Sequence, residues 1–183
     1  TRTPLQIWFW GAYLVTTQTP GMSALQFQRQ LGLSCYETAF QLLHKLRAGM
    51  VRPDRERIGT EWPVELDETL VGGKTRGEGR GVHHKMYVVG AVEVRQKQDK
   101  RGHRAVYAGR LRLQMLSDRS HRSLEAFATD NIESHSQVTT DGWLGYANLA
   151  TMGYDHECVV LEGDPEKTEK ALPMIHLVFS NLK

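Results

Sequence analysis

The sequence has little cysteine and no long run of apolar residues. Its two cysteines, Cys35 and Cys158, form no CxxC pair and are too few for a disulfide framework or a thiol-based zinc site, so a reducing compartment is expected. No stretch approaches the roughly 20 apolar residues that span a membrane. The apolar segment Ile7–Thr16 lacks both a basic leader and a small-residue cleavage site. These absences predict a soluble cytoplasmic protein that is not exported.

The net charge of +2 is spread unevenly along the chain. Between Lys74 and Arg112, eleven lysines and arginines stand against three acidic residues, which gives +8 there and leaves −6 for the rest of the chain. A segment this basic suits a polyanion. A solvated hairpin with charged flanks would have the same composition, so charge alone leaves both interpretations open.

Residues 1–52 have the apolar spacing of helices. In the second half of this region, apolar residues recur at spacings of three and four: Phe40, Leu43, Leu46 and Met50. A short turn with Gly32 precedes them, and Ser34 is placed to cap the second helix. This pattern predicts a helix-turn-helix-like DNA-binding region, although an ordinary helical hairpin would share it.

A polar linker at 53–62 separates this region from residues 63–183, where strand-like and helix-like segments alternate. Three strands are expected at 64–71, 86–95 and 105–116. A helix at 120–132, a strand at 137–140, a helix at 144–152, a strand at 158–162 and a helix beginning near Pro173 follow. This order is typical of a ribonuclease-H-like α/β domain, a mixed sheet with flanking helices, which here would be truncated at its last helix.

Three residues stand at positions where such a fold can carry chemistry. Asp67 lies in the middle of the first strand, although aspartate is a poor strand former. Asp141 ends a short strand rich in β-branched residues, at the edge where α/β sheets bind ligands. His176 follows 35 positions later and seven before Lys183, so these two share a helix face. Taken singly, Asp67 would suit an edge strand, Asp141 a helix cap and His176 a packing position. Together the three residues favour a metal site.

Four ordered blocks carry a resemblance to a known family: VELDETLVGGK at 64–74, VGAVE at 89–93, TDGWLGY at 140–146 and GYDH at 153–156. They resemble the transposase domain of ISXO-type insertion sequences, in the DDE transposase and retroviral-integrase superfamily. The resemblance runs from about Arg2 to Lys183. The zinc ribbon that precedes this region in the family has no counterpart here, so the chain is expected to be a fragment.

The resemblance implies an enzyme that cuts and transfers DNA with two Mg²⁺ or Mn²⁺ ions. Asp67 and Asp141 match the first two metal-binding positions of the family. The third metal-binding residue of the family is often a glutamate, and a lysine or arginine follows it seven positions later. This spacing to Lys183 selects His176 over Asn181 as the third ligand. Because imidazole suits softer ions, His176 would shift the preference from magnesium towards manganese.

Double-stranded DNA, as transposon ends and target, is the implied partner of a homo-oligomeric complex at a prokaryotic nucleoid. Glu68 is expected to point away from Asp67 and to support the site, while Trp143 and Tyr146 pack a helix on the sheet. Two other functions stay open, a catalytically inactive DNA-binding remnant or regulator and a ribonuclease-H-like nuclease without strand transfer. The residues expected to contact DNA phosphates are Lys74, Arg76, Arg80, Lys85 and Lys183.

Overall fold

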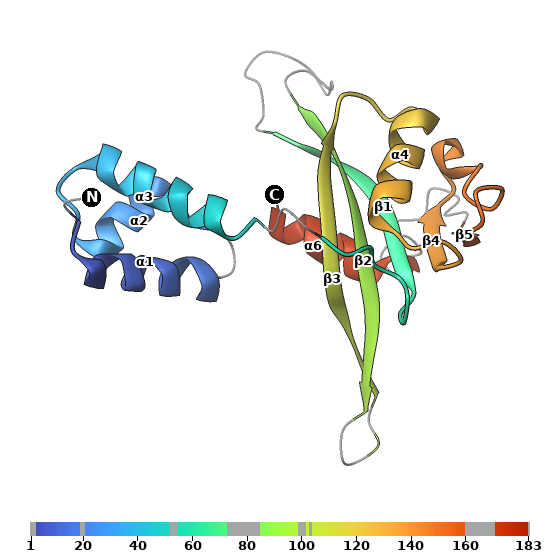
Figure 1. Cartoon of the computed structure of the whole chain (residues 1–183), viewed down its shortest axis with the longest axis horizontal. Helices are drawn as coiled ribbons and strands as arrows, with labels where there is room; N and C mark the ends of the chain where they lie inside the picture. Colours follow the sequence, from blue (N-terminus) through green and yellow to red (C-terminus); the bar gives the residue numbers. More distant parts are fainter. Residues whose placement is uncertain are drawn as a thin grey trace. The chain divides into compact units, whose positions relative to one another are not determined.

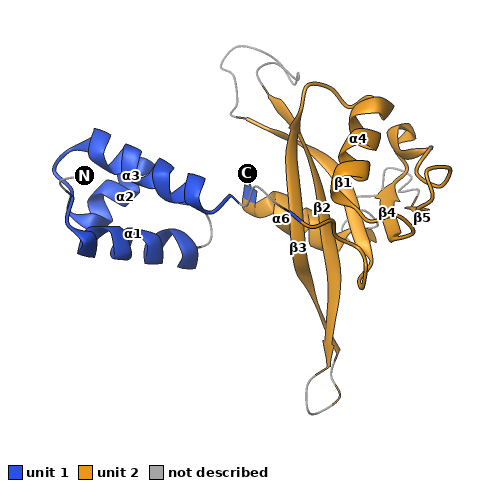
Figure 2. Ribbon diagram, viewed as in Figure 1, with its two compact units in different colours: residues 1–55, 182 blue, residues 56–181, 183 orange. Residues whose placement is uncertain are grey.

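The computed structural model describes residues 3–18, 21–51, 55–72, 85–98, 102, 104–159 and 171–182 (Figure 1). The chain divides into two compact units (Figure 2). One unit comprises residues 1–55 with residue 182, and the other comprises residues 56–181 with residue 183. Across these described ranges, no helix has both the length and the apolar character needed to cross a membrane.

The first unit contains three helices, α1 (Leu5–Thr17), α2 (Ala24–Leu31) and α3 (Tyr36–Gly49). Ser23 caps α2 by accepting a hydrogen bond from the Gln26 amide at 3.2 Å. Gly32 ends α2 in the left-handed conformation, with φ of 63°. The expectation that Ser34 caps α3 is wrong, because Cys35 occupies the cap position and makes no side-chain cap bond.

The core of this helical unit is formed by one buried residue before α2, one within it and three on α3: Met22, Phe27, Ala39, Leu42 and Leu43. Helix α1 lies close to α2, since a Cβ on Gly11 would be 2.8 Å from the Phe27 ring. Four large apolar residues of α1 instead face outward: Leu5, Phe9, Trp10 and Tyr13. A helix, a tight glycine turn and a second helix are therefore present, as the sequence pattern predicted.

The second unit is built on a five-stranded mixed sheet in the order β3-β2-β1-β4-β5 (Figure 1). Its strands are β1 (Val64–Val71), β2 (Met86–Gln98), β3 (Arg104–Leu116), β4 (Gln137–Asp141) and β5 (Asp155–Val159). The first three pair antiparallel, and β4 pairs parallel with both β1 and β5. The chain thus has the ribonuclease-H-like fold class expected from its sequence.

Two elements differ from the sequence prediction. The helix expected at 144–152 is only a short 3₁₀ turn, η1 (Leu144–Tyr146), followed by further turns to Gly153. Glycine and asparagine favour turns over helix here, and a Cβ on Gly145 would lie 2.6 Å from the Trp143 indole. The strand expected at 158–162 begins three residues earlier, at Asp155, because β5 pairs along all of β4; residues 160–162 lie outside the described part.

Helices cover both faces of the sheet. Helix α4 (His121–Asn131) and η1 pack on the face that carries Leu66 of β1. Helix α6 (Pro173–Leu182), which begins at the predicted proline, packs on the opposite face. It comes so close to β2 that a Cβ on Gly90 would lie 2.8 Å from the Ile175 side chain. Because strand residues alternate between faces, Glu65 and Asp67 face α6, whereas Leu66 and Glu68 face α4 and η1.

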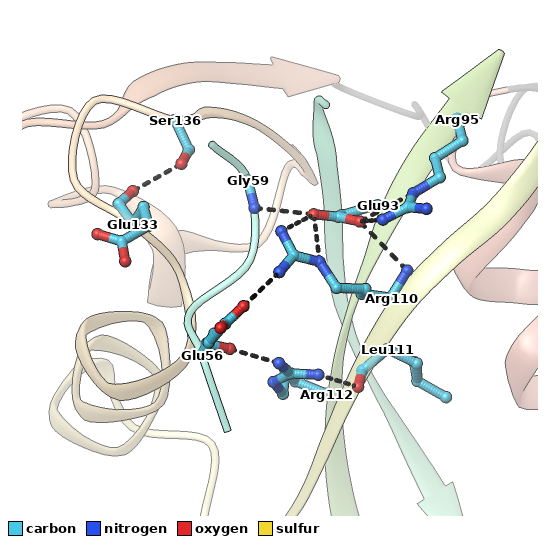
Figure 3. A network of polar contacts seen from close by, with 9 residues as sticks. All are labelled: Glu56, Gly59, Glu93, Arg95, Arg110, Leu111, Arg112, Glu133 and Ser136. Atoms are coloured by element: carbon cyan, nitrogen blue, oxygen red, sulfur yellow. Dashed lines mark hydrogen bonds and ion pairs between the residues drawn. The ribbon is translucent and has the colours of Figure 1, made fainter. Parts of the chain in front are cut away.

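A buried ionic network ties the segment before β1 to the sheet (Figure 3). The carboxylate of Glu93 on β2 has no exposed surface and forms ion pairs of 2.8 Å with both Arg95 and Arg110. The Gly59 amide donates a further hydrogen bond to it at 3.3 Å. Arg112 donates to the Glu56 carbonyl, so β2 and β3 together hold the chain from residue 56 to residue 59.

Candidate active site

The two aspartates singled out in the sequence lie on neighbouring parallel strands. The pairing of β1 with β4 joins Glu65 to Thr139 and Leu66 to Thr140, so the next step along each strand sets Asp67 beside Asp141. Residues at matching positions of parallel strands point to the same face, with the strands about 4.8 Å apart. The fold therefore brings together two carboxylates that are 74 positions apart in the sequence.

His176 reaches Asp67 from helix α6. Its Nε2 atom lies 3.2 Å from Oδ2 of Asp67, and the two side chains are 25% and 12% exposed. Asn181 lies five residues further along α6 and is exposed to solvent. Of the two residues considered for the third position, His176 is the one that the structure places against Asp67.

Glu65 fixes the start of helix α6. One carboxylate oxygen of this buried residue accepts hydrogen bonds from the backbone amides of Met174 and Ile175, each at 2.8 Å. A carboxylate at a helix N-terminus satisfies amides that have no partner within the helix and lies at the positive end of the helix dipole. Burial raises the pKa of Glu65, and these two hydrogen bonds oppose that rise. Glu65 thereby holds α6 two residues before Asp67 on the same face of β1.

The turn after β4 orients Asp141. Its Oδ1 atom accepts a hydrogen bond from the Trp143 backbone amide at 3.0 Å. Burial raises the pKa of Asp141, and the neighbouring negative charge of Asp67 adds to the rise. The Trp143 hydrogen bond and the positive charges of Arg119 and His176 act in the opposite direction. The site thus concentrates negative charge that a bound cation would stabilise.

Glu68 points to the other face of β1, as predicted from strand alternation. The Tyr146 hydroxyl donates to one of its oxygens at 2.6 Å, and Arg119 donates to the other at 3.3 Å. Burial raises the pKa of Glu68, and the charges of Asp67 and Asp141 add to this effect. Tyr146 is buried, as expected of a packing residue, whereas Trp143 is 37% exposed.

Sequence reasoning missed Glu65 and Arg119. Glu65 could have been found, because it stands two positions before Asp67 and therefore on the same face of the strand. Arg119 lies in the loop before α4, and its guanidinium stacks on the Trp143 ring at 3.9 Å from the ring centroid. No local pattern marks this arginine, because its partners are 51 positions before it and 24 after it.

Some arginines of the basic segment 74–112 form contacts within the sheet unit. Arg95 and Arg110 pair with Glu93, and Arg112 donates to backbone carbonyls of Glu56 and Leu111. Lys85 lies just before β2 and is half-buried. The other residues expected to contact phosphates, namely Lys74, Arg76, Arg80 and Lys183, lie outside the described residues.

The side chains at the site have the chemistry of a divalent-cation site without forming a complete one. Among the residues that the structure describes, no three His, Cys, Asp or Glu side chains form a group able to hold a metal ion. Two ligands at right angles, each about 2.1 Å from an ion, are about 3 Å apart. The 3.2 Å between Asp67 and His176 matches that separation, so the pair fits one ion.

Comparison with known protein families gives a match over most of the chain. The family model described as an ISXO2-like transposase domain matches residues 59–183, which include the whole sheet and all three candidate site residues. No curated protein matches the chain closely enough to extend this result.

Proposed function

Since the chain belongs to the ISXO2-like transposase domain family over residues 59–183, we propose that it cuts DNA at insertion-sequence ends and joins them to target DNA. The observation that carries this proposal is the placement of Asp67 and Asp141 side by side on parallel strands, with His176 in contact with Asp67. These three side chains come from β1, β4 and α6 and lie on the same face of the sheet.

Asp67, Asp141 and His176 are the residues that would hold two magnesium or manganese ions. Bound divalent ions stabilise the attacking and leaving oxygens of an in-line displacement at phosphorus. In the first step, water attacks a phosphodiester and the released strand ends in a 3′-hydroxyl. In the second step, this hydroxyl attacks a target phosphodiester, forming one P–O bond as another breaks. Glu65 would keep His176 in place, and the Trp143 amide would orient Asp141.

DNA binding is assigned to basic residues of the sheet unit and to the helical region 1–52. Lys74, Arg76, Arg80, Lys85 and Lys183 would contact phosphates, which fix the position of the duplex without reading its sequence. The α2–Gly32–α3 arrangement supports a helix-turn-helix-like role for residues 1–52. The outward side of α3 carries His44 and Lys45, while Arg47 donates to the Met22 carbonyl. The active assembly would be a homo-oligomer on DNA, in the cytoplasm at the nucleoid.

Nicking of supercoiled plasmid and joining of a labelled duplex to that plasmid test both steps. Asp67→Asn and Asp141→Asn should each lower Mn²⁺-dependent nicking by more than about a hundredfold, because each removes a ligand charge. DNA binding, measured by fluorescence anisotropy, should stay within about twofold of the unmodified chain. Asp130→Asn is the matched control, because Asp130 is an exposed aspartate of α4.

Each outcome separates the proposal from its alternatives. Nicking that persists in Asp67→Asn would remove Asp67 from the chemistry. Nicking without joining would identify a nuclease that lacks strand transfer. DNA binding with neither metal uptake nor nicking would identify a DNA-binding remnant or regulator.

A further inference from the structure

Arg119 links two separate segments that flank the candidate site. It lies in the loop between β3 and α4, and its side chain is 41% exposed. Nη1 donates to Oε1 of Glu68 on β1 at 3.3 Å, while the guanidinium carbon lies 3.9 Å from the Trp143 ring centroid. Trp143 follows β4, so one side chain connects β1 to the turn that carries Asp141.

The end of this link on β1 is firmly held. The Glu68 side chain is only 7% exposed, and its second oxygen accepts from the Tyr146 hydroxyl at 2.6 Å. A charge-assisted hydrogen bond to a carboxylate that is itself fixed leaves the guanidinium little freedom. This hydrogen bond helps to keep the Arg119 guanidinium over the Trp143 ring.

The other end of the link controls the orientation of a carboxylate. Trp143 donates its backbone amide to Oδ1 of Asp141 at 3.0 Å. Its indole also packs on Gly145, where a Cβ would lie 2.6 Å from the indole nitrogen. A shift of the indole would therefore move the backbone that orients Asp141.

We propose that Arg119 is a positioning residue, which holds the Trp143 turn against β1 and so keeps the Asp141 carboxylate beside Asp67. The role rests on the proposed metal-dependent function and acts through Trp143 rather than on the reacting atoms. By charge alone, a guanidinium beside carboxylates would weaken the binding of a divalent cation. Positioning and charge therefore predict opposite effects when Arg119 is replaced.

The test is Mn²⁺ binding to the purified chain, followed by the loss of the electron paramagnetic resonance signal of free Mn²⁺. Arg119→Gln and Trp143→Leu should each weaken binding about twofold to fivefold, the range that an exposed cation–π contact spans. Arg119→Lys should resemble Arg119→Gln, because it keeps the charge but loses the flat stacked face. Trp143→Phe should lie between Trp143→Leu and the unmodified chain.

The double variant Arg119→Gln/Trp143→Leu should bind within about twofold of the weaker single variant, because both changes break the same contact. Arg122→Gln, three positions later on α4 and also exposed, is the matched control and should bind normally. Circular dichroism melts identify any variant that fails to fold, and Arg119→Lys and Trp143→Phe then carry the comparison.

Three results would overturn the proposal: tighter Mn²⁺ binding by Arg119→Gln, unchanged binding by Arg119→Lys, or fully additive losses in the double variant. Failure of the proposed function is distinguishable from these results. In that case the unmodified chain and Asp67→Asn would bind Mn²⁺ equally poorly, and the role of Arg119 would fall with the metal site.

Discussion

The buried Glu93 network makes the stability of the sheet unit dependent on acid. Burial alone would raise the pKa of Glu93, but hydrogen bonds from Arg110, Arg95 and the Gly59 amide outweigh it and lower the pKa to about 2 from an ordinary 4.5. As the pH falls, the unfolded chain takes up this proton first. The stabilisation is therefore fully present above about pH 4.5 and is lost as the pH falls towards about 2.

The size of the effect follows from the two pKa values. The difference between 4.5 and about 2 corresponds to about 3 kcal/mol of unfolding free energy. Glu93→Gln removes the charge that titrates. Between pH 4.5 and about 2, the unmodified chain should therefore lose about 3 kcal/mol more unfolding free energy than the variant. At pH 7 the same change should cost about 3 to 5 kcal/mol, because it leaves two guanidinium groups without their carboxylate.

Urea unfolding at pH 7, 4.5, 3 and 2.5 measures both quantities. Replacing Trp8 and Trp10 by phenylalanine leaves Trp62 and Trp143, so the fluorescence then reports the sheet unit. Glu157→Gln, at an exposed glutamate of β5, is the matched control and should follow the parent curve. Parallel pH profiles for Glu93→Gln and its parent would refute the reasoning, because Glu93 would then titrate alike in the folded and unfolded chain.

Two further outcomes are expected from the candidate site and the basic segment. In plasmid nicking assays with each metal, His176→Ala should lose most activity, and His176→Glu should keep or raise activity with magnesium. Lost nicking in Asn181→Ala together with normal nicking in His176→Ala would instead make Asn181 the third ligand. Replacing Arg76, Arg80 and Lys85 by glutamine should flatten the salt dependence of DNA affinity by roughly 0.9 in log–log slope per lost phosphate contact, measured by anisotropy. An unchanged slope would mean that these side chains are only solvated.

The strands that carry the two aspartates could be predicted because their signals are local. Val64–Val71 and Gln137–Asp141 are rich in β-branched residues, and the aspartates stand out as poor strand formers. The edge strand β5 was harder to predict. Its residues Asp155, His156 and Glu157 are polar, so its pairing with β4, and not its composition, defines where it begins.

The short turn after β4 shows a different limit of sequence reasoning. Apolar residues between 144 and 152 suggested a helix, but Trp143 turns outward and Gly145 fits under its indole. Arg119 also contacts Trp143, and these two residues are too far apart in the sequence for any helix or strand period to reveal their contact.

Strand β1 explains why the candidate site is determined by tertiary contacts more than by any motif. Within four residues, Glu65 holds the start of α6, Asp67 faces His176, and Glu68 holds Arg119 and Tyr146. Strand alternation sends the first two carboxylates to one face and the third to the other. Because Glu65 holds α6 and Glu68 holds Arg119 and Tyr146, a change at Glu65 should displace α6 without disturbing the Trp143 turn. A change at Glu68 should disturb that turn and leave α6 in place.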